Sequence, residues 1–297
     1  MQIFGLWDQG LHRAPDVVKK CFDRWQALNP RSSLTVFDAA GLRDALTGYP
    51  PWIQDIPIQA LSDIFRLELL ARQGGVWVDA TALPVVPLDE WLPQALAPAG
   101  FFAFSGRRGN RFGPIDSWFL AARPGNPACR AWLEAVQGYW DRPRALSPAT
   151  LPTRKRQARL QRLARKFLDR KGLTWERMYV RDPRWAIREE GRRSQVYPYF
   201  WLFLLAADLK ETCPKFRDAL TSMPAFPHEL THALQWSAPP RAVRDDGLKA
   251  SLPLLLSVAP VHKLDWRRDW PEALWTANPA YPVLLPSTRT VDDSAGR

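Results

Sequence analysis

The chain has 297 residues, of which 46% are hydrophobic and 12% aromatic, enough for a large buried core. Its net charge of +11 is concentrated in residues 151–193, which hold 15 Lys or Arg against 5 Asp or Glu, a balance of +10. The rest of the chain is therefore close to neutral, which argues against nucleic-acid binding over the whole molecule. The three cysteines have no CxxC spacing, so we expect neither a disulfide framework nor a structural zinc site.

The N-terminal part of the chain alternates between strand and helix patterns. No basic stretch followed by an apolar run opens the sequence, so we expect no signal peptide. Residues 2–7 predict a strand, residues 15–28 an amphipathic helix and residues 34–38 a second strand, with another helix at about 39–46. This alternation is typical of an α/β fold with a mixed, mainly parallel sheet.

Residues 61–81, LSDIFRLELLARQGGVWVDAT, are the most informative stretch of the chain. The first part predicts a helix in which Asp63 and Arg66, three residues apart, leave the same face. A Gly-Gly pair ends that helix, because glycine tolerates the left-handed cap, and a short apolar strand then ends on Asp79. A carboxylate at the carboxyl end of a buried strand points into the crevice where open α/β sheets bind ligands. The three side chains are therefore expected to face one ligand.

The second half of the chain contains further elements. Residues 101–105 and 118–122 predict paired strands joined by a glycine-rich loop, which either closes over a ligand or is an ordinary hairpin loop. Residues 195–235 predict helices, and the apolar run at 252–258 predicts a last strand. The longest apolar run, at 197–209, is too short to cross a bilayer and is expected to be a buried helix.

The basic segment 151–193 has the pattern of an amphipathic helix. Apolar residues recur there at helical spacing, and basic residues occupy much of the remaining surface. This pattern indicates either a helix that lies on an anionic membrane surface or a solvated helix that packs on the rest of the chain. A third alternative is a non-enzymatic protein that binds polyanions through this segment.

Residues 228–232, HELTH, match the H-E-x-x-H pattern of zinc peptidases. In that pattern His228 and His232 lie one helical turn apart and bind zinc, and Glu229 is the general base. No G-x-x-H extension follows, and no convincing downstream glutamate supplies a third ligand. A metallopeptidase is thus an alternative from a different enzyme class.

SDIFRL at 62–67, followed by GGVWVDAT at 74–81, resembles the paired signature of the capsular polysaccharide synthesis family of DXD glycosyltransferases. Weaker matches occur in the same order, and they read IFGLWDQG, IDSWFLAARPGNP, YPYFWLFLL and PVHKLDWR. Together they cover most of residues 1–140 and 195–268. The resemblance implies a Rossmann-like GT-A nucleotide-sugar-binding fold, interrupted here by the basic helical insertion.

The resemblance also implies an activity and its partners. A sugar would move from a nucleotide-diphosphate donor, with a UDP-sugar favoured, to a hydroxyl of a capsule, lipopolysaccharide or other glycan acceptor, with retention of the anomeric configuration. The acceptor would be a glycan or a lipid-linked glycan. The enzyme would be cytoplasmic, with peripheral contact to the anionic inner face of the cell membrane and no nucleic-acid partner.

Six side chains receive roles in the donor site from this resemblance. Trp7 would stack on the nucleotide base, and Asp63 would bind donor hydroxyls. Arg66 would contact the donor sugar or phosphate, and Asp79 would bind a metal ion and the ribose. His262 and Lys263 would hold the diphosphate together, since an ammonium can neutralise its charge.

A divalent cation, Mn²⁺ or Mg²⁺, is implied as cofactor, with Asp79 and His262 as its ligands. Thr81 stands where the wider superfamily has the second carboxylate of the Asp-X-Asp motif, so we expect the cation to bind weakly. Asp116, at the start of the IDSWFLAA strand, is a further catalytic candidate on the acceptor side.

These expectations divide the chain into four parts. Residues 1–150 would form the nucleotide-sugar-binding half, and residues 151–193 the basic insertion. Residues 194–285 would complete the same catalytic domain with helices and a closing strand, and residues 286–297 would be a flexible tail.

Overall fold

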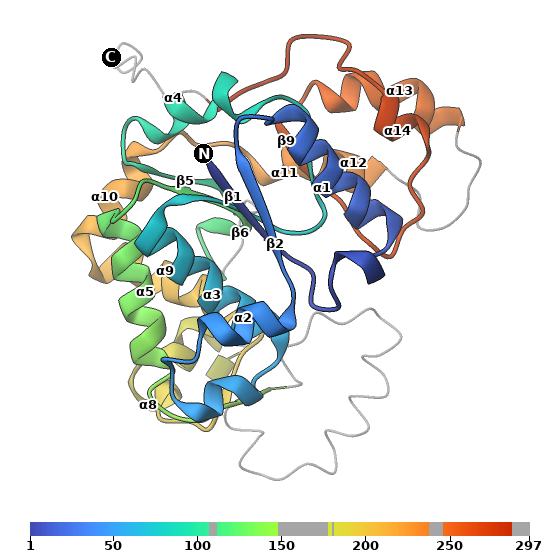
Figure 1. The fold of residues 1–297 in the computed structure, drawn as a ribbon. Helices are drawn as coiled ribbons and strands as arrows, with labels where there is room; N and C mark the ends of the chain where they lie inside the picture. Colours follow the sequence, from blue (N-terminus) through green and yellow to red (C-terminus); the bar gives the residue numbers. More distant parts are fainter. Residues whose placement is uncertain (107–111, 148–177, 180, 238–245, 287–297) are drawn as a thin grey trace, which may run out of the picture.

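A five-stranded mixed sheet forms the centre of the molecule (Figure 1). The computed structural model describes residues 1–106, 112–147, 178–179, 181–237 and 246–286. The strands follow the order β2-β1-β3-β6-β5. Their bounds are β1 Gln2–Leu6, β2 Ser33–Phe37, β3 Gly75–Val78, β5 Phe101–Ser105 and β6 Ile115–Ala122. β1 pairs in parallel with β2 and β3, whereas β6 is antiparallel to β3 and β5. Four strands therefore run in one direction, which confirms the predicted mixed, mainly parallel α/β sheet.

Helices cover both faces of this sheet. The helices are α1 Asp16–Leu28, α2 Ala39–Ala45, α3 Ile58–Gln73, α4 Leu92–Leu96, α5 Pro127–Tyr139, α8 Glu189–Arg192, α9 Trp201–Thr212, α10 Pro214–Ser222, α11 His228–Thr231, α12 Ala233–Ser237, α13 Asp246–Leu256 and α14 Ala273–Thr276. Short 3-10 helices span Leu11–Arg13, Pro51–Asp55, Leu88–Glu90 and Pro183–Ile187. Two-stranded sheets join β4 Ala82–Pro84 to β9 Val261–Lys263 and β7 Ala145–Leu146 to β8 Val196–Tyr197.

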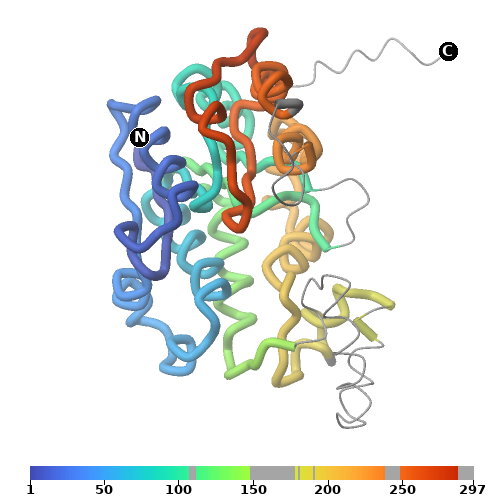
Figure 2. The backbone as a smooth tube through the Cα atoms, turned by 90° about the vertical axis from the view of Figure 1, so that its right-hand side faces the viewer, coloured from blue at the N-terminus to red at the C-terminus, as the bar shows by residue number. Residues whose placement is uncertain are grey.

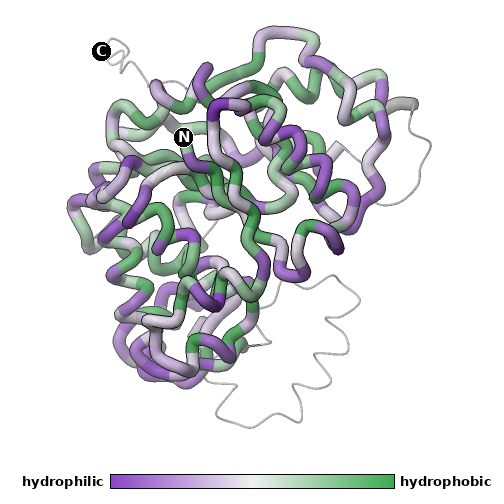
Figure 3. Tube along the Cα trace, in the orientation of Figure 1, coloured by the Kyte–Doolittle hydropathy of each residue, from purple (hydrophilic) through white to green (hydrophobic). Residues whose placement is uncertain are grey.

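The core consists of two buried clusters, one on each face of the main sheet. Successive side chains of a strand point to opposite faces. In β3, Trp77 accordingly packs with α3, α5 and α9, whereas Val76 and Val78 pack with α1, α4 and α13. Figure 3 shows the apolar residues gathered along the strands, with polar residues on the outer helix surfaces. The central strand β3 is thus apolar on both faces, as expected for a sheet that is covered on both sides.

A tight turn between α3 and β3 brings the two halves of the 61–81 stretch together. Gly74 and Gly75 have φ angles of 67° and 99° in the region that favours glycine. A Cβ atom on Gly74 would lie 2.5 Å from the Pro124 nitrogen, and one on Gly75 would lie 2.7 Å from the Gln2 carbonyl oxygen. No side chain fits at either position, so the turn requires both glycines.

The C-terminal segment packs beside the first helix of the chain, as the two ends of the colour scale show in Figure 2. Arg24 of α1 donates to the Trp275 carbonyl oxygen at 3.1 Å, and Lys20 forms an ion pair with Glu272 at 2.5 Å. β9 pairs with β4 in the same region, so the PVHKLDWR segment lies directly beyond Asp79. The chain's distant ends therefore build one side of the molecule together.

The strand predicted at 252–258 is wrong. Most of that run belongs to α13, which continues through Pro253, and the strand in this region is β9 at Val261–Lys263. A short continuous apolar run does not distinguish a buried helix from a buried strand, because neither shows a periodic pattern.

The predicted basic helix lies in residues 148–177 for most of its length, outside the described part of the chain. From residue 181 onward, the described remainder of the 151–193 segment forms a 3-10 turn and α8. Among the described residues, no helix is both long and apolar enough to cross a membrane.

Candidate active site

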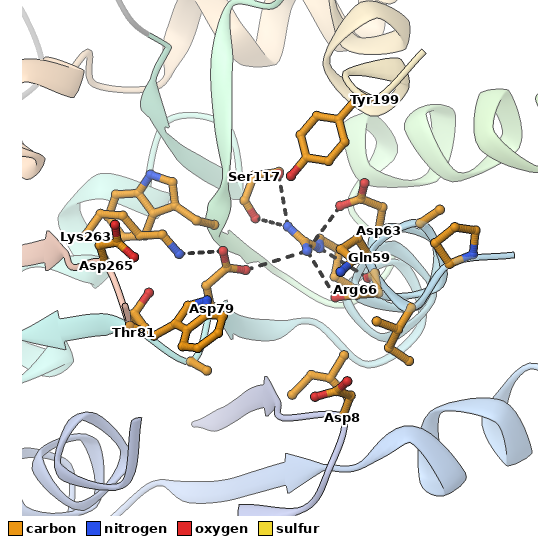
Figure 4. Close-up of a pocket in the computed structure, with 18 of the residues that line it drawn as sticks. Asp8, Gln59, Asp63, Arg66, Asp79, Thr81, Ser117, Tyr199, Lys263 and Asp265 are labelled. Atoms are coloured by element: carbon orange, nitrogen blue, oxygen red, sulfur yellow. Dashed lines mark hydrogen bonds and ion pairs between the residues drawn. The ribbon is translucent and has the colours of Figure 1, made fainter. Parts of the chain in front are cut away.

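A cavity of about 890 Å³ opens at the carboxyl ends of β1 and β3, within the usual size range of small-molecule sites. Its walls come from the segments after these two strands, from the N-terminal half of α3 and from residues 263–267 beyond β9. Tyr199 and the start of α9 close the opposite side (Figure 4). The cavity thus occupies the crevice where open α/β sheets bind ligands.

Arg66 lies at the centre of the polar groups in this cavity, and its side chain is only 7% exposed. Its guanidinium donates to the Ser117 carbonyl oxygen at 2.6 Å and to the Ser62 hydroxyl at 3.1 Å. It also pairs with Asp63 at 3.1 Å and lies 3.6 Å from Asp79. The planar group is therefore held rigidly between two carboxylates, as Figure 4 shows.

Asp79 is paired with a lysine that comes from far along the chain. Lys263 donates to the Asp79 carboxylate at 2.6 Å, and the Trp77 indole donates to the other oxygen at 3.3 Å. Burial alone would raise the pKa of Asp79, but the cations of Lys263 and Arg66 outweigh it and hold this pKa below its usual value. Asp79 is thus ionised at neutral pH, and 31% of its side chain stays exposed to the cavity.

Asp63 has the opposite shift. Burial raises its pKa to about 6, with the Asp79 charge adding to this effect and the Arg66 cation opposing it. Two carboxylates in one cavity therefore differ in pKa, which is a common property of functional sites.

Aromatic side chains form another wall of the cavity. Trp7 follows β1 and contacts Trp266 edge to face, with ring centroids 5.9 Å apart. Arg267 lies over the outer face of Trp266 at 4.4 Å from the ring centroid. Trp266 is 43% exposed, so an aromatic surface is available to a planar ligand.

The structure places six of the seven candidate residues at or beside this cavity, and one away from it. Trp7, Asp63, Arg66, Asp79 and Lys263 line the cavity together, and Asp116 lies just behind the wall formed by Trp118. His262 is fully buried and does not line the cavity. Burial lowers the pKa of His262 to about 4, and the Leu256 backbone opposes this effect.

The position of His262 follows from its strand. It pairs with Leu83 in the β4–β9 ladder, and the adjacent Lys263 points to the other face, toward Asp79. The expectation that both residues of the His-Lys pair face one ligand is therefore not supported, and we omit His262 from the site.

Asp79 lacks the partners that a divalent cation requires. Thr81 supplies no second carboxylate, and Lys263 already contacts the carboxylate of Asp79. Among the described residues, Asp79 belongs to no cluster of three or more metal-ligating side chains. The residues around Asp79 therefore do not fit a divalent cation, and a protein ammonium group lies where we expected one.

The described part of the chain does contain a cluster with metal-ligating groups, formed by Asp116, His228 and His232. One potential ligand atom from each residue lies within 4.8 Å of the other two. Burial, with His228 acting in the same direction, lowers the pKa of His232 to about 4. The two histidines of the HELTH motif thus meet a carboxylate, which comes from β6 and not from a downstream helix.

Among the residues that line the cavity, sequence reasoning gave no role to Ser117, Tyr199, Asp265 and Trp266. Each lies inside a quoted motif, IDSWFLAARPGNP, YPYFWLFLL or PVHKLDWR, so membership of these motifs was the available signal. Their side chains carry no distinctive spacing, and only the fold brings them to the cavity.

Comparison with known proteins gives a consistent result. Residues 1–147 match the family model described as capsular polysaccharide synthesis protein. The chain is 28% identical to glycosyltransferase afumC of Aspergillus fumigatus over 163 residues, which are 47% of this chain and 40% of that protein. It is 27% identical to "Putative glycosyltransferase HOC1" of Saccharomyces cerevisiae over 85 residues, 25% of this chain and 22% of that protein.

Among solved structures, the PaToxG glycosyltransferase overlaps 74% of this chain and 84% of its own, with 14% identity and a TM-score of 0.36. The matched segment spans less than half the length of either curated relative. The signature residues Asp63, Arg66 and Asp79 lie inside the region that the family model matches. Residues 1–147 of this chain are thus similar to the capsular polysaccharide synthesis family, and the two curated relatives are glycosyltransferases by name, which supports a glycosyltransferase assignment.

Proposed function

We propose that this protein transfers a sugar from a nucleotide-diphosphate donor to a hydroxyl group of a glycan acceptor. The observation that carries the proposal is the alternating set of charges in the cavity, in which Asp63, Arg66, Asp79 and Lys263 contact one another in series. The set lies at the carboxyl ends of parallel strands, and three of its four members, Asp63, Arg66 and Asp79, lie within the region that the family model matches.

The reaction makes a specific electrostatic demand on the site. Breaking the bond between the anomeric carbon and the donor phosphate leaves negative charge on the diphosphate. Preorganised cations stabilise such charge without reorganisation at the moment of reaction. Arg66 and Lys263 are held in place by Asp63, Asp79 and Ser117, so their charges would face the diphosphate from fixed positions.

The carboxylates have a second use in this proposal. Asp79 is ionised and partly exposed, so its oxygens can accept hydrogen bonds from ribose or sugar hydroxyls. Asp63 has a pKa of about 6 and can both donate and accept near neutral pH. Trp7 and Trp266 would pack against the nucleotide base.

The finer features of the activity are also part of the proposal. A UDP-sugar as donor, retention of configuration, and a capsule, lipopolysaccharide or lipid-linked acceptor follow from the family resemblance. Contact with an anionic membrane would use the basic segment 151–193. The carboxylate of Asp116 is hydrogen-bonded to His228 and Trp118, so it has no acceptor role in this proposal.

The metallopeptidase remains the second candidate, because one observation favours it. His228 and His232 lie close to the Asp116 carboxylate, and in a zinc peptidase the two histidines of the motif bind zinc together with a third ligand. Cleavage of casein by the zinc-loaded chain, lost in Glu229→Gln, would support this activity. Absence of cleavage would leave the cluster without a peptidase role.

A donor screen tests the transferase directly. The melting temperature is measured with UDP- and GDP-sugars, in EDTA and in manganese, because a ligand that binds the native state raises it. We expect a rise with one donor class in EDTA as well as in manganese, and no rise with a free sugar. No rise with any nucleotide sugar would contradict the proposal.

A further inference from the structure

The Asp116 cluster adjoins Trp118, whose indole donates to Asp116 at 3.1 Å and whose ring centroid lies 5.9 Å from Lys263 Nζ. Asp116 is the second residue of β6, and His228 begins α11. His232 follows α11 one helical turn later, so its ring stacks on that of His228 with centroids 3.7 Å apart. Segments 112 residues apart in the sequence thus place a carboxylate and two imidazoles together.

We propose that Asp116, His228 and His232 bind a single divalent transition-metal ion, with zinc as the preferred ion. Two imidazoles and one carboxylate form the donor set that zinc and its neighbours accept with further positions open, whereas magnesium and calcium prefer oxygen ligands. This site is separate from Asp79, and the proposal holds whether or not the chain transfers a sugar.

Neighbouring groups hydrogen-bond to Asp116 and His232, in the way that groups outside the first coordination shell orient metal ligands. The Trp118 indole donates to the Asp116 carboxylate at 3.1 Å. Nδ1 of His232 lies 3.0 Å from both the Thr231 hydroxyl and the His228 carbonyl oxygen. With Nδ1 engaged in this way, Nε2 is the nitrogen of His232 that is free to bind an ion.

The distances require only a small adjustment. Zinc bonds of about 2.1 Å to nitrogen and oxygen place two ligand atoms of one ion roughly 3 to 4 Å apart. The three candidate atoms already lie within 4.8 Å of one another. The 2.7 Å hydrogen bond between His228 Nδ1 and Asp116 would open slightly as an ion replaces the shared proton.

The position of the cluster gives the ion access to ligands. His232 and Trp236 line the cavity, and Trp236 packs on both imidazole rings with centroids 5.7 and 6.0 Å away. An ion at this place would therefore have protein ligands on one side and the cavity on the other. Its open coordination positions would take oxygen atoms of water or of a bound molecule.

Zinc uptake by the full chain tests the proposal. The protein is dialysed against a chelator, loaded with zinc and desalted, and the zinc content is measured by mass spectrometry. We expect one zinc per chain, and a titration in which His228→Gln and His232→Gln each weaken zinc binding at least about tenfold. Cobalt in place of zinc should give visible absorption bands that the double variant lacks.

Two further variants make the test specific. His12→Gln removes an exposed histidine outside the cluster and should bind zinc as the wild type does. Trp118→Phe keeps an aromatic ring but removes the donor to Asp116, and should weaken binding without abolishing it. A folded wild-type chain that takes up no stoichiometric zinc would overturn the proposal. Equal uptake by a folded His228→Gln/His232→Gln variant would overturn it as well.

Discussion

Two polar clusters lie side by side at this cavity, and they balance their charges in different ways. The first pairs Asp63 and Asp79 with two cationic side chains, Arg66 and Lys263. The second sets one carboxylate, Asp116, against the two imidazoles of His228 and His232. The first cluster therefore carries its cations within the protein, whereas the second has ligand atoms but no permanent positive charge.

This difference shows why the signature Asp79 does not identify a metal site. A carboxylate that is held by an ammonium at 2.6 Å has its charge neutralised, and a divalent cation would have to displace Lys263. The imidazoles of the second cluster contact Asp116, Thr231 and a backbone carbonyl oxygen, and an imidazole nitrogen with a lone pair can bind a metal ion. Positive charge for a donor diphosphate and a site for a metal ion are thus provided by neighbouring but separate groups.

The largest expected effect comes from breaking the first cluster at its centre. Arg66→Met leaves two carboxylates in a buried place without their shared partner, and such losses cost about 3–5 kcal/mol of unfolding free energy. Chemical denaturation measures this loss. Arg193→Met is the control, because Arg193 pairs with Glu189 through side chains that are 75% and 88% exposed. It should cost about 1 kcal/mol or less. Similar losses of unfolding free energy in both variants would show that the ion pairs of Arg66 contribute no more to stability than an exposed pair.

The pKa of Asp63 predicts a pH effect of similar but smaller size. The folded-state pKa of about 6 exceeds the usual 3.8, so protonated Asp63 favours the folded state and its contribution is lost as pH rises toward 6. Asp63→Asn lacks this loss. Its unfolding free energy relative to the wild type should therefore rise by about 3 kcal/mol between pH 4 and pH 7. A relative stability that does not change with pH would contradict the assignment.

Lys263 sharpens the comparison, because it belongs to one cluster only. In Lys263→Met the diphosphate loses one preorganised cation, so donor turnover should fall about 100-fold. Zinc uptake should stay unchanged, since Lys263 is not a metal ligand. Lys210→Met, on the exposed surface of α9, should alter neither property. A variant that loses zinc and turnover together would show that the two clusters act as one.

The part of the site that could be predicted from the sequence is the part encoded locally. The helix, the Gly-Gly turn and the strand that ends on Asp79 follow from short-range patterns, and they place Asp63, Arg66 and Asp79 in one cavity as predicted. Lys263 was predicted to join them only through the family resemblance, in which the PVHKLDWR segment follows the other motifs in order. No local signal relates Lys263 to a residue 184 positions away.

Two errors have a common physical origin in the C-terminal part. The apolar run at 252–258 was expected to be the last strand, which placed the His-Lys pair after that strand and not within one. The pair is instead within β9, where alternation turns His262 into the core and Lys263 toward Asp79. The wrong assignment of the strand to 252–258 therefore led to the wrong orientation for the His262 side chain.

The second cluster shows the opposite limit. The spacing of His228 and His232 predicted that their rings would share one face, which the stacking confirms. Asp116 lies far away in the sequence and was assigned to the acceptor side. Only the pairing of β6 with its neighbours and the placement of α11 reveal its contact with His228.

The central claim is that the Asp79 region binds and activates a nucleotide-sugar donor. Release of nucleoside diphosphate by wild-type protein and by Asp79→Asn, with the donor that raises the melting temperature, tests it most directly. The variant keeps the side-chain shape but loses the charge that holds Lys263 and Arg66, so release should fall about 100-fold or more with the melting temperature retained. Asp23→Asn, on the exposed face of α1, should release diphosphate at the wild-type rate. A folded Asp79→Asn variant with wild-type release would contradict the account.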